Sequence, residues 1–319
     1  MTTLKEETYT LLNDAGTFVH IYHWSPTSPE SSIKAIVQIA HGMAESAERY
    51  VELAQKLTDQ GFIVYAHDHR GHGKTAPTLD DLGYPGNNGL EGMYEDMILM
   101  RDWIQTRHLD TPLFLLGHSM GSFLTQKMMC TVNQAYQGFI LSGTNGPRPL
   151  LSIAVQLAKL ECKFQGDRHP STMMNALSFG SFNHKFRPVR TPFDWLSRDQ
   201  HEVDLYMKNP YCGFLCSAGF FYGLFTLLQE IHKPELMKQL DVNKPVFIIS
   251  GDQDPVGNFG IGIRKLTDLY RYIGLQDLEV KLYEGGRHEV LHEINREEVM
   301  DNIIDWLHRH LDVDLTENV

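Results

Sequence analysis

The stretch that decides the fold class is LFLLGHSMGS, residues 113–122. Its first four residues are apolar and predict a buried strand, and the residues after Gly121 predict a helix. Between them lies Gly117-His118-Ser119-Met120-Gly121, the one G-x-S-x-G pattern in the chain, in the strand–turn–helix setting that this pattern requires. So tight a turn strains the backbone of Ser119 and leaves no room for side chains at positions 117 and 121. We therefore predict that the Ser119 hydroxyl is presented in the open as a nucleophile.

Outward from this stretch, short apolar runs alternate with longer amphipathic segments. The chain opens with two predicted strands joined at residues 13–16, Asn-Asp-Ala-Gly, which are typical of a hairpin turn. Continuous apolar strands that alternate with helices predict a mostly parallel central sheet with helices on both faces, which is the α/β class. The strands predicted after the hairpin are 35–40, 62–66, 113–116, 139–141, 246–250 and 278–283.

The helices between these strands carry start and stop signals. One helix is predicted to begin with Ser46 as its N-cap and to end at Gly61. The last helix is predicted to begin after Asn295, and Glu298 three residues later matches a capping box. Further helices are predicted over 89–107, beyond Gly121 and near 261–273.

The alternation fails between Gly146 and about Lys238, where the chain is rich in Met and aromatic residues. We interpret this span as a mainly helical cap inserted into the sheet domain, near the carboxyl ends of the strands, where such folds bind ligands. Packing beside the sheet as additional core is the alternative. The predicted organisation is a sheet domain built from residues 1–145 and 239–319, interrupted by the cap at 146–238.

Two parts of this cap have an unusual composition. Residues 209–229 form the most apolar stretch and carry no charge, but their Asn, Pro, Gly and Ser content favours a buried or interface-facing segment over a membrane span. Residues 146–190 contain seven basic and two acidic residues, a net charge of +5. This basic, apolar half could rest against an anionic membrane or micelle surface, and scattered solvated charges are the plainer interpretation.

The composition of the whole chain excludes several classes of protein. A length of 319 residues, with 42% hydrophobic and 21% charged residues, fits one large globular domain or a domain with an insertion. A net charge of −12 does not suit binding to nucleic-acid phosphates, so we expect no nucleic-acid partner. The opening MTTLKEETYT lacks the apolar core of a secretory signal, and four cysteines are too few for a disulfide scaffold in a chain of this length. We therefore expect a cytoplasmic protein.

A nucleophilic serine needs a base and an orienting acid from elsewhere in the chain. One predicted strand ends in two candidate acids, Asp252 and Asp254, and the next leads through Gly-Gly to His288. These residues follow strand ends, as Ser119 does, so we expect them at the same edge of a parallel sheet. Asp254 is preferred as the acid because a turn begins after it, whereas Asp252 would stabilise that turn. His288 is preferred as the base over His292, which we expect on a helix face.

Acyl transfer also needs two backbone amides aimed at the negative charge that develops on the substrate. Met120 follows the predicted nucleophile directly, and the loop after the strand 35–40 reads His-Gly-Met-Ala-Glu over residues 41–45. We predict that the backbone amides of Met43 and Met120 form this oxyanion hole. Nothing in this set of residues calls for a cofactor.

One further motif suggests a metal. The stretch HDHRGHG, residues 67–73, resembles the H-x-H-x-D-H start of metallo-hydrolases. Gly71 stands where that motif has an Asp, and further ligands cannot be placed. We therefore expect no metal site, and we interpret the stretch as a turn in which Asp68 and Arg70 tie loops together.

With these residues in hand, the chain resembles the monoglyceride lipase and lysophospholipase-like group of the α/β-hydrolase superfamily. The resemblance covers nearly the whole sheet domain in the right order, and cap residues 194–214 are similar to bacterial members. It implies the α/β-hydrolase fold, with Ser119 as nucleophile, Asp254 as acid, His288 as base and the oxyanion amides named above. Ser122 departs from the family, which often has Gly there. The matching segments are HGMAESAERY (41–50), AHDHRGHGKT (66–75), LLGHSMGS (115–122), SGDQDPVG (250–257) and YEGGRHEVLHEINREEV (283–299).

The resemblance implies a serine hydrolase that cleaves carboxylic esters of single-chain lipids, a monoacylglycerol or a lysophospholipid, through an acyl-enzyme. A short-chain carboxylesterase is the first alternative, and it would need a cap with a wide polar mouth. A serine aminopeptidase is the second, and it would need cap carboxylates such as Glu202 and Asp204 to hold a substrate amine. The third is a non-catalytic binding protein of the same fold, although such proteins commonly lose one catalytic group.

Overall fold

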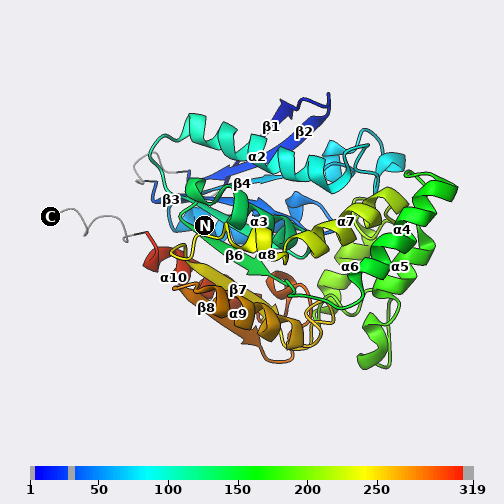
Figure 1. Ribbon diagram of the computed structural model, residues 1–319. Helices are drawn as coiled ribbons and strands as arrows, with labels where there is room; N and C mark the ends of the chain where they lie inside the picture. Colours follow the sequence, from blue (N-terminus) through cyan, green and yellow to red (C-terminus); the bar gives the residue numbers. More distant parts are fainter. Residues whose placement is uncertain (1–3, 28–32, 312–319) are drawn as a thin grey trace.

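A computed structural model describes residues 4–27 and 33–311 of the chain. The extreme ends of the two predicted halves of the sheet domain lie outside the described residues. So do the first three residues of the stretch that was examined for a secretory signal. The described residues form an eight-stranded sheet in the order β1-β2-β4-β3-β5-β6-β7-β8 (Figure 1). The hairpin of β1 and β2 is antiparallel and joins β4 in antiparallel fashion, and all other neighbours are parallel. The predicted α/β class is confirmed. The strands are β1 Lys5–Leu12, β2 Phe18–Ser25, β3 Ala35–Ala40, β4 Phe62–His67, β5 Leu113–His118, β6 Gly138–Ser142, β7 Val246–Gly251 and β8 Leu278–Tyr283.

Helices cover both faces of this sheet because the central strands are apolar on both faces. In β5, Leu113 and Leu115 belong to one buried cluster together with α2, α3 and α9, whereas Phe114 and Leu116 belong to a second cluster with α1 and α10. This alternation is the two-residue period of a strand. The helices are α1 Val51–Asp59, α2 Gly89–Arg107, α3 Met120–Thr131, α4 Leu151–Gln165, α5 Thr172–Phe179, α6 Gln200–Lys208, α7 Ala218–Glu230, α8 Pro234–Met237, α9 Ile261–Ile273 and α10 Arg296–Arg309.

The predicted strands agree with the structure to within two residues at each end, and the predicted bounds of α2 and α9 are correct. Ser46 and Asn295 stand at the predicted N-cap positions, but neither side chain makes a capping hydrogen bond. The Ser46 side chain makes no capping bond, and the turn that follows it is a 3-10 helix, where the amide of Ala47 donates to Asp68 Oδ1 at 2.8 Å. Asn295 stands at the N-cap position of α10, but its side-chain oxygen accepts from Arg198 at 3.0 Å rather than from the helix backbone.

The segment between β6 and β7 contains α4 to α8, and we refer to residues 146–238 as the inserted segment. Figure 1 shows α4, α5 and α6 gathered at one end of the molecule, away from α10. The apolar stretch 209–229 enters α7, whose Phe220 and Phe221 are fully buried, in agreement with the prediction of a buried segment. Among the described residues, no helix is both long enough and apolar enough to cross a bilayer.

Candidate active site

Ser119 sits in the sharp turn between β5 and α3. Its backbone has φ 51° and ψ −117°, a conformation that costs energy for a residue with a side chain. A Cβ at Gly121 would lie 2.1 Å from the carbonyl oxygen of Ala40, and one at Gly117 would lie 2.3 Å from Thr125 Oγ1. The two glycines therefore allow α3 to start directly against β3, and the strained turn directs the serine hydroxyl away from the sheet.

His288 connects this hydroxyl to a buried carboxylate. Its Nε2 lies 2.9 Å from Ser119 Oγ, and its Nδ1 lies 3.0 Å from Asp254 Oδ2. The Asp254 side chain is fully buried and is fixed by the backbone amide of Val256, which donates to Oδ1 at 2.8 Å. With Nδ1–H donating to Asp254, Nε2 is free to accept the Ser119 proton, which is the alignment that general-base activation requires.

The surroundings of His288 favour its protonated form. Burial alone would lower the pKa of this imidazole, but the negative charge of Asp254 and the hydrogen bond to it outweigh burial, so the pKa lies above the ordinary value of 6.5. The neighbouring His118, whose ring centroid is 4.9 Å from that of His288, behaves in the opposite way. Burial and the charge of His288 lower the pKa of His118 to about 4, so it stays neutral beside the site.

The amides of Met43 and Met120 border the same point. Both residues line the cavity that contains Ser119, Met120 as the first residue of α3 and Met43 in the loop after β3. In the described part of the chain, neither amide donates a hydrogen bond to a protein group. The positive end of the α3 dipole adds to the attraction for negative charge at this position.

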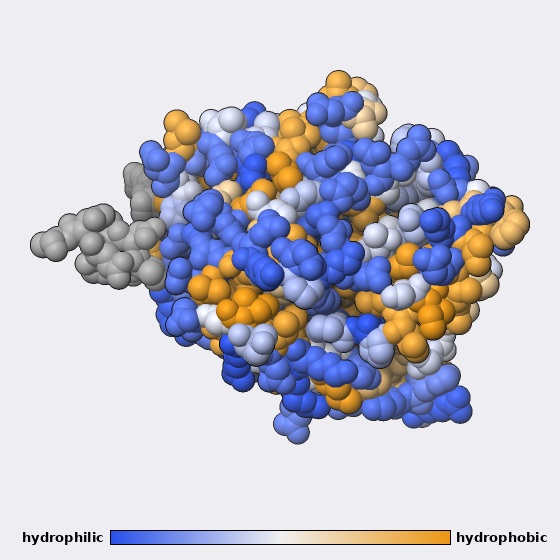
Figure 2. Space-filling model, in the orientation of Figure 1, coloured by the Kyte–Doolittle hydropathy of each residue, from blue (hydrophilic) through white to orange (hydrophobic). Residues whose placement is uncertain are grey.

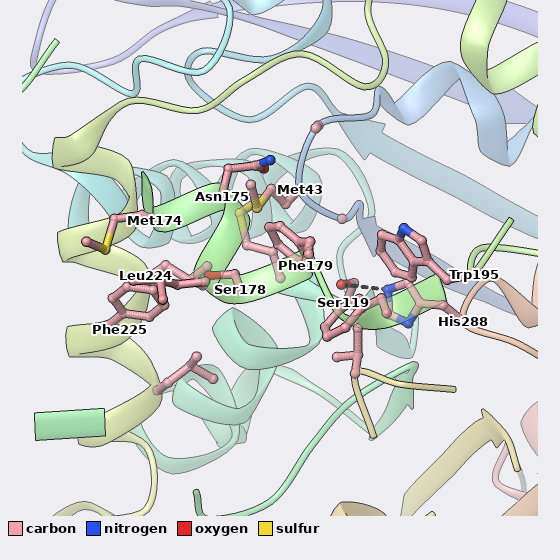
Figure 3. Close-up of a pocket in the computed structure, with 18 of the residues that line it drawn as sticks. Met43, Ser119, Met174, Asn175, Ser178, Phe179, Trp195, Leu224, Phe225 and His288 are labelled. Carbon is pink, nitrogen blue, oxygen red and sulfur yellow. Dashed lines mark hydrogen bonds between the residues drawn. The ribbon is translucent and has the colours of Figure 1, made fainter. Parts of the chain in front are cut away.

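The cavity above Ser119 has a volume of about 770 Å³ and is lined largely by the inserted segment (Figure 3). Apolar side chains dominate its wall, and they come from α4, α5 and α7 as well as from Trp195. Figure 3 shows Phe179 and Trp195 near Ser119 and His288, with Leu224 and Phe225 farther along the wall. The apolar lining residues include Leu151, Ile153, Ala154, Leu157, Met174, Leu177, Phe179, Phe182, Trp195, Phe214, Leu224, Phe225 and Leu228.

The competing residues named from the sequence lie elsewhere. Asp252 Oδ1 accepts from the amide of Gly285 at 2.8 Å, so it binds the loop after β8 and not the turn after Asp254 that we expected it to stabilise. His292 lies in a short 3-10 helix, Val290–His292, and its Nε2 is 3.1 Å from the carbonyl oxygen of Arg49, so the structure does not bring it to Ser119.

The histidine-rich stretch 67–73 is a turn tied to its surroundings by charged residues. Asp68 accepts from the amide of Lys74 at 2.8 Å in addition to that of Ala47. Arg70 forms a buried ion pair with Asp96, with Nε 2.5 Å from Oδ2. Asp68 therefore ties this turn to the segment after β3, as predicted, whereas Arg70 ties it to helix α2 and not to another loop.

One group of side chains in the described part of the chain could hold a metal ion, and it lies at the opposite end of β8 from the active site. Asp277, Glu279 and His310 bring ligand atoms within 4.8 Å of one another. His310 is already bonded to Asp277 at 3.0 Å, and Arg309 pairs with Glu279 at 2.9 Å. Because Asp277 and Glu279 are already paired with these side chains, they need no metal cation to balance their charge.

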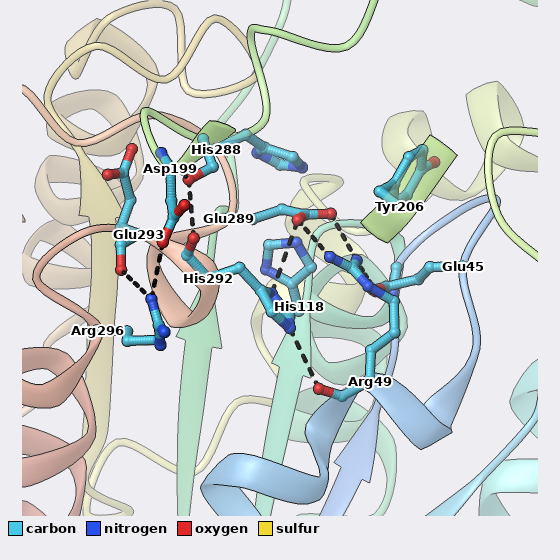
Figure 4. Close-up of polar contacts among 12 residues, drawn as sticks. Glu45, Arg49, His118, Asp199, Tyr206, His288, Glu289, His292, Glu293 and Arg296 are labelled. Atoms are coloured by element: carbon cyan, nitrogen blue, oxygen red, sulfur yellow. Dashed lines mark hydrogen bonds and ion pairs between the residues drawn. The ribbon is translucent and has the colours of Figure 1, made fainter. Parts of the chain in front are cut away.

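Sequence reasoning missed a buried clamp that joins the oxyanion loop to the histidine loop (Figure 4). Arg49 donates to both oxygens of Glu289 at 2.7 Å and to Glu45 at 2.6 Å. Glu45 in turn accepts from the amide of Gly42 at 2.6 Å. The guanidinium holds the pKa of Glu289 at about 2 even though burial opposes this. Glu289 follows His288 directly, so this clamp joins the loop that contains Met43 to the loop that contains His288.

The inserted segment also reaches the histidine loop. The ring of Trp195 lies 5.2 Å from that of His288, between centroids, and its carbonyl oxygen accepts from the His288 amide at 3.4 Å. Arg198 binds Glu293 at 2.9 Å. The Arg49 and Arg198 contacts join residues far apart in the chain, so only the high density of charged residues near 287–298 could have signalled them.

A strained serine between a strand and a helix, with a histidine and a buried aspartate behind it on a mostly parallel sheet, defines an α/β-hydrolase. The chain belongs to the family described as serine aminopeptidase, S33, whose profile matches residues 31–295. Its resemblance to the monoglyceride lipase group is confirmed by its relatives.

Two of these relatives come from distant organisms. A monoacylglycerol lipase of Mycolicibacterium smegmatis is 28% identical over 291 residues, covering 89% of this chain and 91% of its own. A monoglyceride lipase of Mus musculus is 27% identical, covering 89% of this chain and 88% of its own. Among solved structures, a thermostable carboxyl esterase from Bacillus coagulans in complex with glycerol has a TM-score of 0.88 at 28% identity, covering 98% of this chain and all of its own. The names of these relatives describe hydrolases that act on esters.

Proposed function

We propose that this protein is a serine hydrolase that cleaves carboxylic esters of single-chain lipids through an acyl-enzyme. The observation that carries the proposal is the hydrogen-bonded series Ser119–His288–Asp254 at the base of a largely apolar cavity. In this proposal Ser119 is the nucleophile, His288 the base and Asp254 the acid. The relatives named as monoacylglycerol and monoglyceride lipases support the same class of substrate.

The proposed reaction has two halves. His288 Nε2 takes the hydroxyl proton as Ser119 Oγ attacks the ester carbonyl, and Asp254 stabilises the imidazolium that forms. The amides of Met43 and Met120 donate to the oxyanion, and His288 returns the proton to the departing alcohol. A water molecule, activated by the same imidazole, then attacks the acyl-enzyme and releases the fatty acid.

The apolar lining of the cavity favours a substrate whose apolar part is a long acyl chain. Each methylene that enters such a wall contributes about 0.8 kcal/mol. A cavity volume of about 770 Å³ is larger than an acetyl ester needs.

The aminopeptidase alternative is less well supported, because the carboxylates lining the cavity, Glu45 and Glu289, are both paired with Arg49. Asp204 is paired with Arg190, and neither Glu202 nor Asp204 is among the lining residues.

We further propose that the inserted segment acts as a cap that rests on the lipid surface from the cytoplasmic side. One face of α4 exposes apolar side chains at helical spacing, which we call the α4 ridge: Leu150, Ile153, Leu157, Leu160 and Phe164. Figure 2 shows apolar surface at the end of the molecule where α4 and α5 lie. Lys159 and Lys163 flank this face and are exposed, as contact with anionic head groups would require. Part of the ridge also lines the cavity, so an acyl chain could pass from the surface to Ser119 without crossing water.

The test is a series of glycerol monoesters and p-nitrophenyl esters with acyl chains from two to eighteen carbons. The proposal expects kcat/KM to rise by about a factor of four per methylene over the short chains, as 0.8 kcal/mol per methylene implies. A maximum at acetate would contradict the lipid assignment and support a short-chain carboxylesterase. Turnover of aminoacyl-arylamides in place of esters would support an aminopeptidase.

A further inference from the structure

Arg148 contributes a positive charge to the wall of the cavity. The charged residues of the wall, apart from histidines, are Glu45, Glu289 and Arg148. The two carboxylates are neutralised by Arg49. In the described part of the chain Arg148 has no ion-pair partner, and its guanidinium donates one hydrogen bond, to the carbonyl oxygen of Val256. A guanidinium has five N–H donors in a planar fork, so most of this one's donors are unused by those residues.

Arg148 is placed beside the catalytic loops. It follows β6 in the loop that leads to α4, and its partner Val256 is two residues beyond Asp254 and also lines the cavity. Arg148 is an exposed residue, although neighbouring protein atoms lower the pKa of its guanidinium and the charge of Asp254 opposes this. Both observations describe a cation set into a concave wall. Such a cation would pair with an anionic ligand that enters the cavity.

We propose that Arg148 is an anion-binding residue that recognises the phosphate of a lysophospholipid head group while the acyl chain occupies the apolar part of the cavity. This inference rests on the proposed ester hydrolysis and narrows its substrate from neutral monoacylglycerols to phosphate-bearing lipids. A planar guanidinium fork binds two phosphate oxygens at once, which neutral glycerol cannot match. The carboxylate of a released fatty acid shares this chemistry, but it forms at the carbon that Ser119 attacks, whereas a head-group phosphate lies several bonds away from that carbon.

The experiment compares two substrates with the same lauroyl chain, 1-lauroylglycerol and 1-lauroyl-lysophosphatidylglycerol, both below their critical micelle concentrations. The variants are Arg148→Met, which removes the charge and keeps the length, and Arg148→Lys, which keeps the charge. Arg264→Met serves as the matched control, because Arg264 is an exposed arginine on α9 that does not line the cavity. Inhibition by free laurate is measured for each protein as well.

The proposal predicts that Arg148→Met lowers kcat/KM for the lysophospholipid about 10- to 100-fold, mainly through KM, as loss of a hydrogen bond to a charged group implies. The rate for 1-lauroylglycerol changes less than about threefold, Arg148→Lys restores part of the loss, and Arg264→Met matches the wild type. Equal losses on both substrates would overturn the anion site while leaving ester hydrolysis intact. Relief of laurate inhibition with unchanged substrate selectivity would overturn the head-group assignment. A wild-type protein that hydrolyses neither lipid would contradict the proposed function itself.

Discussion

The edge of the sheet and the inserted segment reach the same cavity in different ways. At the sheet edge the proposed catalytic groups are polar, buried and held by short hydrogen bonds, as Asp254 and His288 are. In the inserted segment most of the side chains that face the cavity are apolar, and several remain exposed, among them Ile153 and Leu177. Fixed polar groups suit a reaction that needs atoms placed to fractions of an ångström, whereas an apolar wall suits a ligand of variable length.

This contrast assigns chemistry to the sheet edge and substrate choice to the inserted segment. Changes at the sheet edge should then reduce turnover of every ester alike. Changes in the inserted segment should alter which ester is preferred and how well the protein reaches lipid. The predictions below test that division.

The largest effect is expected for Ser119→Ala, because Ser119 is the proposed nucleophile that forms the acyl-enzyme. We expect kcat to fall by about 10⁴- to 10⁶-fold for short and long esters alike, with the fold retained by circular dichroism. Ser178→Ala is the matched control, since Ser178 also lines the cavity and should keep its activity within about threefold. Substantial residual turnover in Ser119→Ala would place the chemistry on another residue.

Asp254→Asn should come next, with a loss of about 10⁴-fold in kcat. It should also move the pH profile. In the wild type the base must be neutral, so kcat/KM should rise with pH through a value above 6.5, because Asp254 raises the pKa of His288. Without that charge, burial dominates and the apparent pKa should fall, so the rising limb moves to lower pH. A limb that stays in place or moves to higher pH would contradict the proposed pairing.

Arg49→Met should affect stability and turnover together. It would leave Glu45 and Glu289 buried without their cation, and breaking a buried pair in this way costs about 3–5 kcal/mol. We expect a loss of this size in the free energy of unfolding, measured by urea denaturation, and lower kcat at temperatures where the variant is folded. Arg101→Met, which breaks an exposed pair with Asp102, should cost less than about 1 kcal/mol. Equal effects of the two variants would show that the clamp contributes no more than a surface ion pair.

The smallest effect is expected in the inserted segment. The double variant Leu160→Ser, Phe164→Ser removes two exposed apolar side chains of the α4 ridge that do not line the cavity. Binding to anionic lipid vesicles in a sedimentation assay should weaken about tenfold, since each side chain buries only part of its surface in lipid. Hydrolysis of p-nitrophenyl butyrate in solution should be unchanged. A parallel loss of soluble activity would mean that the ridge supports the catalytic site rather than the membrane contact.

The sequence predicts the sheet well because its signals are local. A strand such as β3 is apolar at nearly every position. Gly117 and Gly121, where a Cβ would collide with neighbouring atoms, indicate the turn at Ser119. The N-cap positions of Ser46 and Asn295 were predicted correctly, but the side-chain oxygen of Asn295 accepts from Arg198, which is distant in sequence, and not from the helix backbone. Local patterns cannot anticipate such competition.

The residues of the candidate site also differ in how well the sequence predicts them. Ser119, Asp254 and His288 could be named because each follows a recognisable strand, and parallel strands end at one edge. The pairing of Arg49 with Glu289 spans 240 residues and has no local pattern. The position of Trp195 beside His288 could not be predicted either. Trp195 belongs to the inserted segment, where no alternation of strands and helices indicates which residues lie near the site.

The central claim is that Ser119 is activated by His288 at the base of the cavity, and labelling with a fluorophosphonate probe tests it most directly. The account predicts a single adduct, located at Ser119 by mass spectrometry, that forms in the wild type and is lost in the folded His288→Ala variant. A folded wild-type protein that remains unlabelled, or that carries the adduct on a different residue, would contradict it.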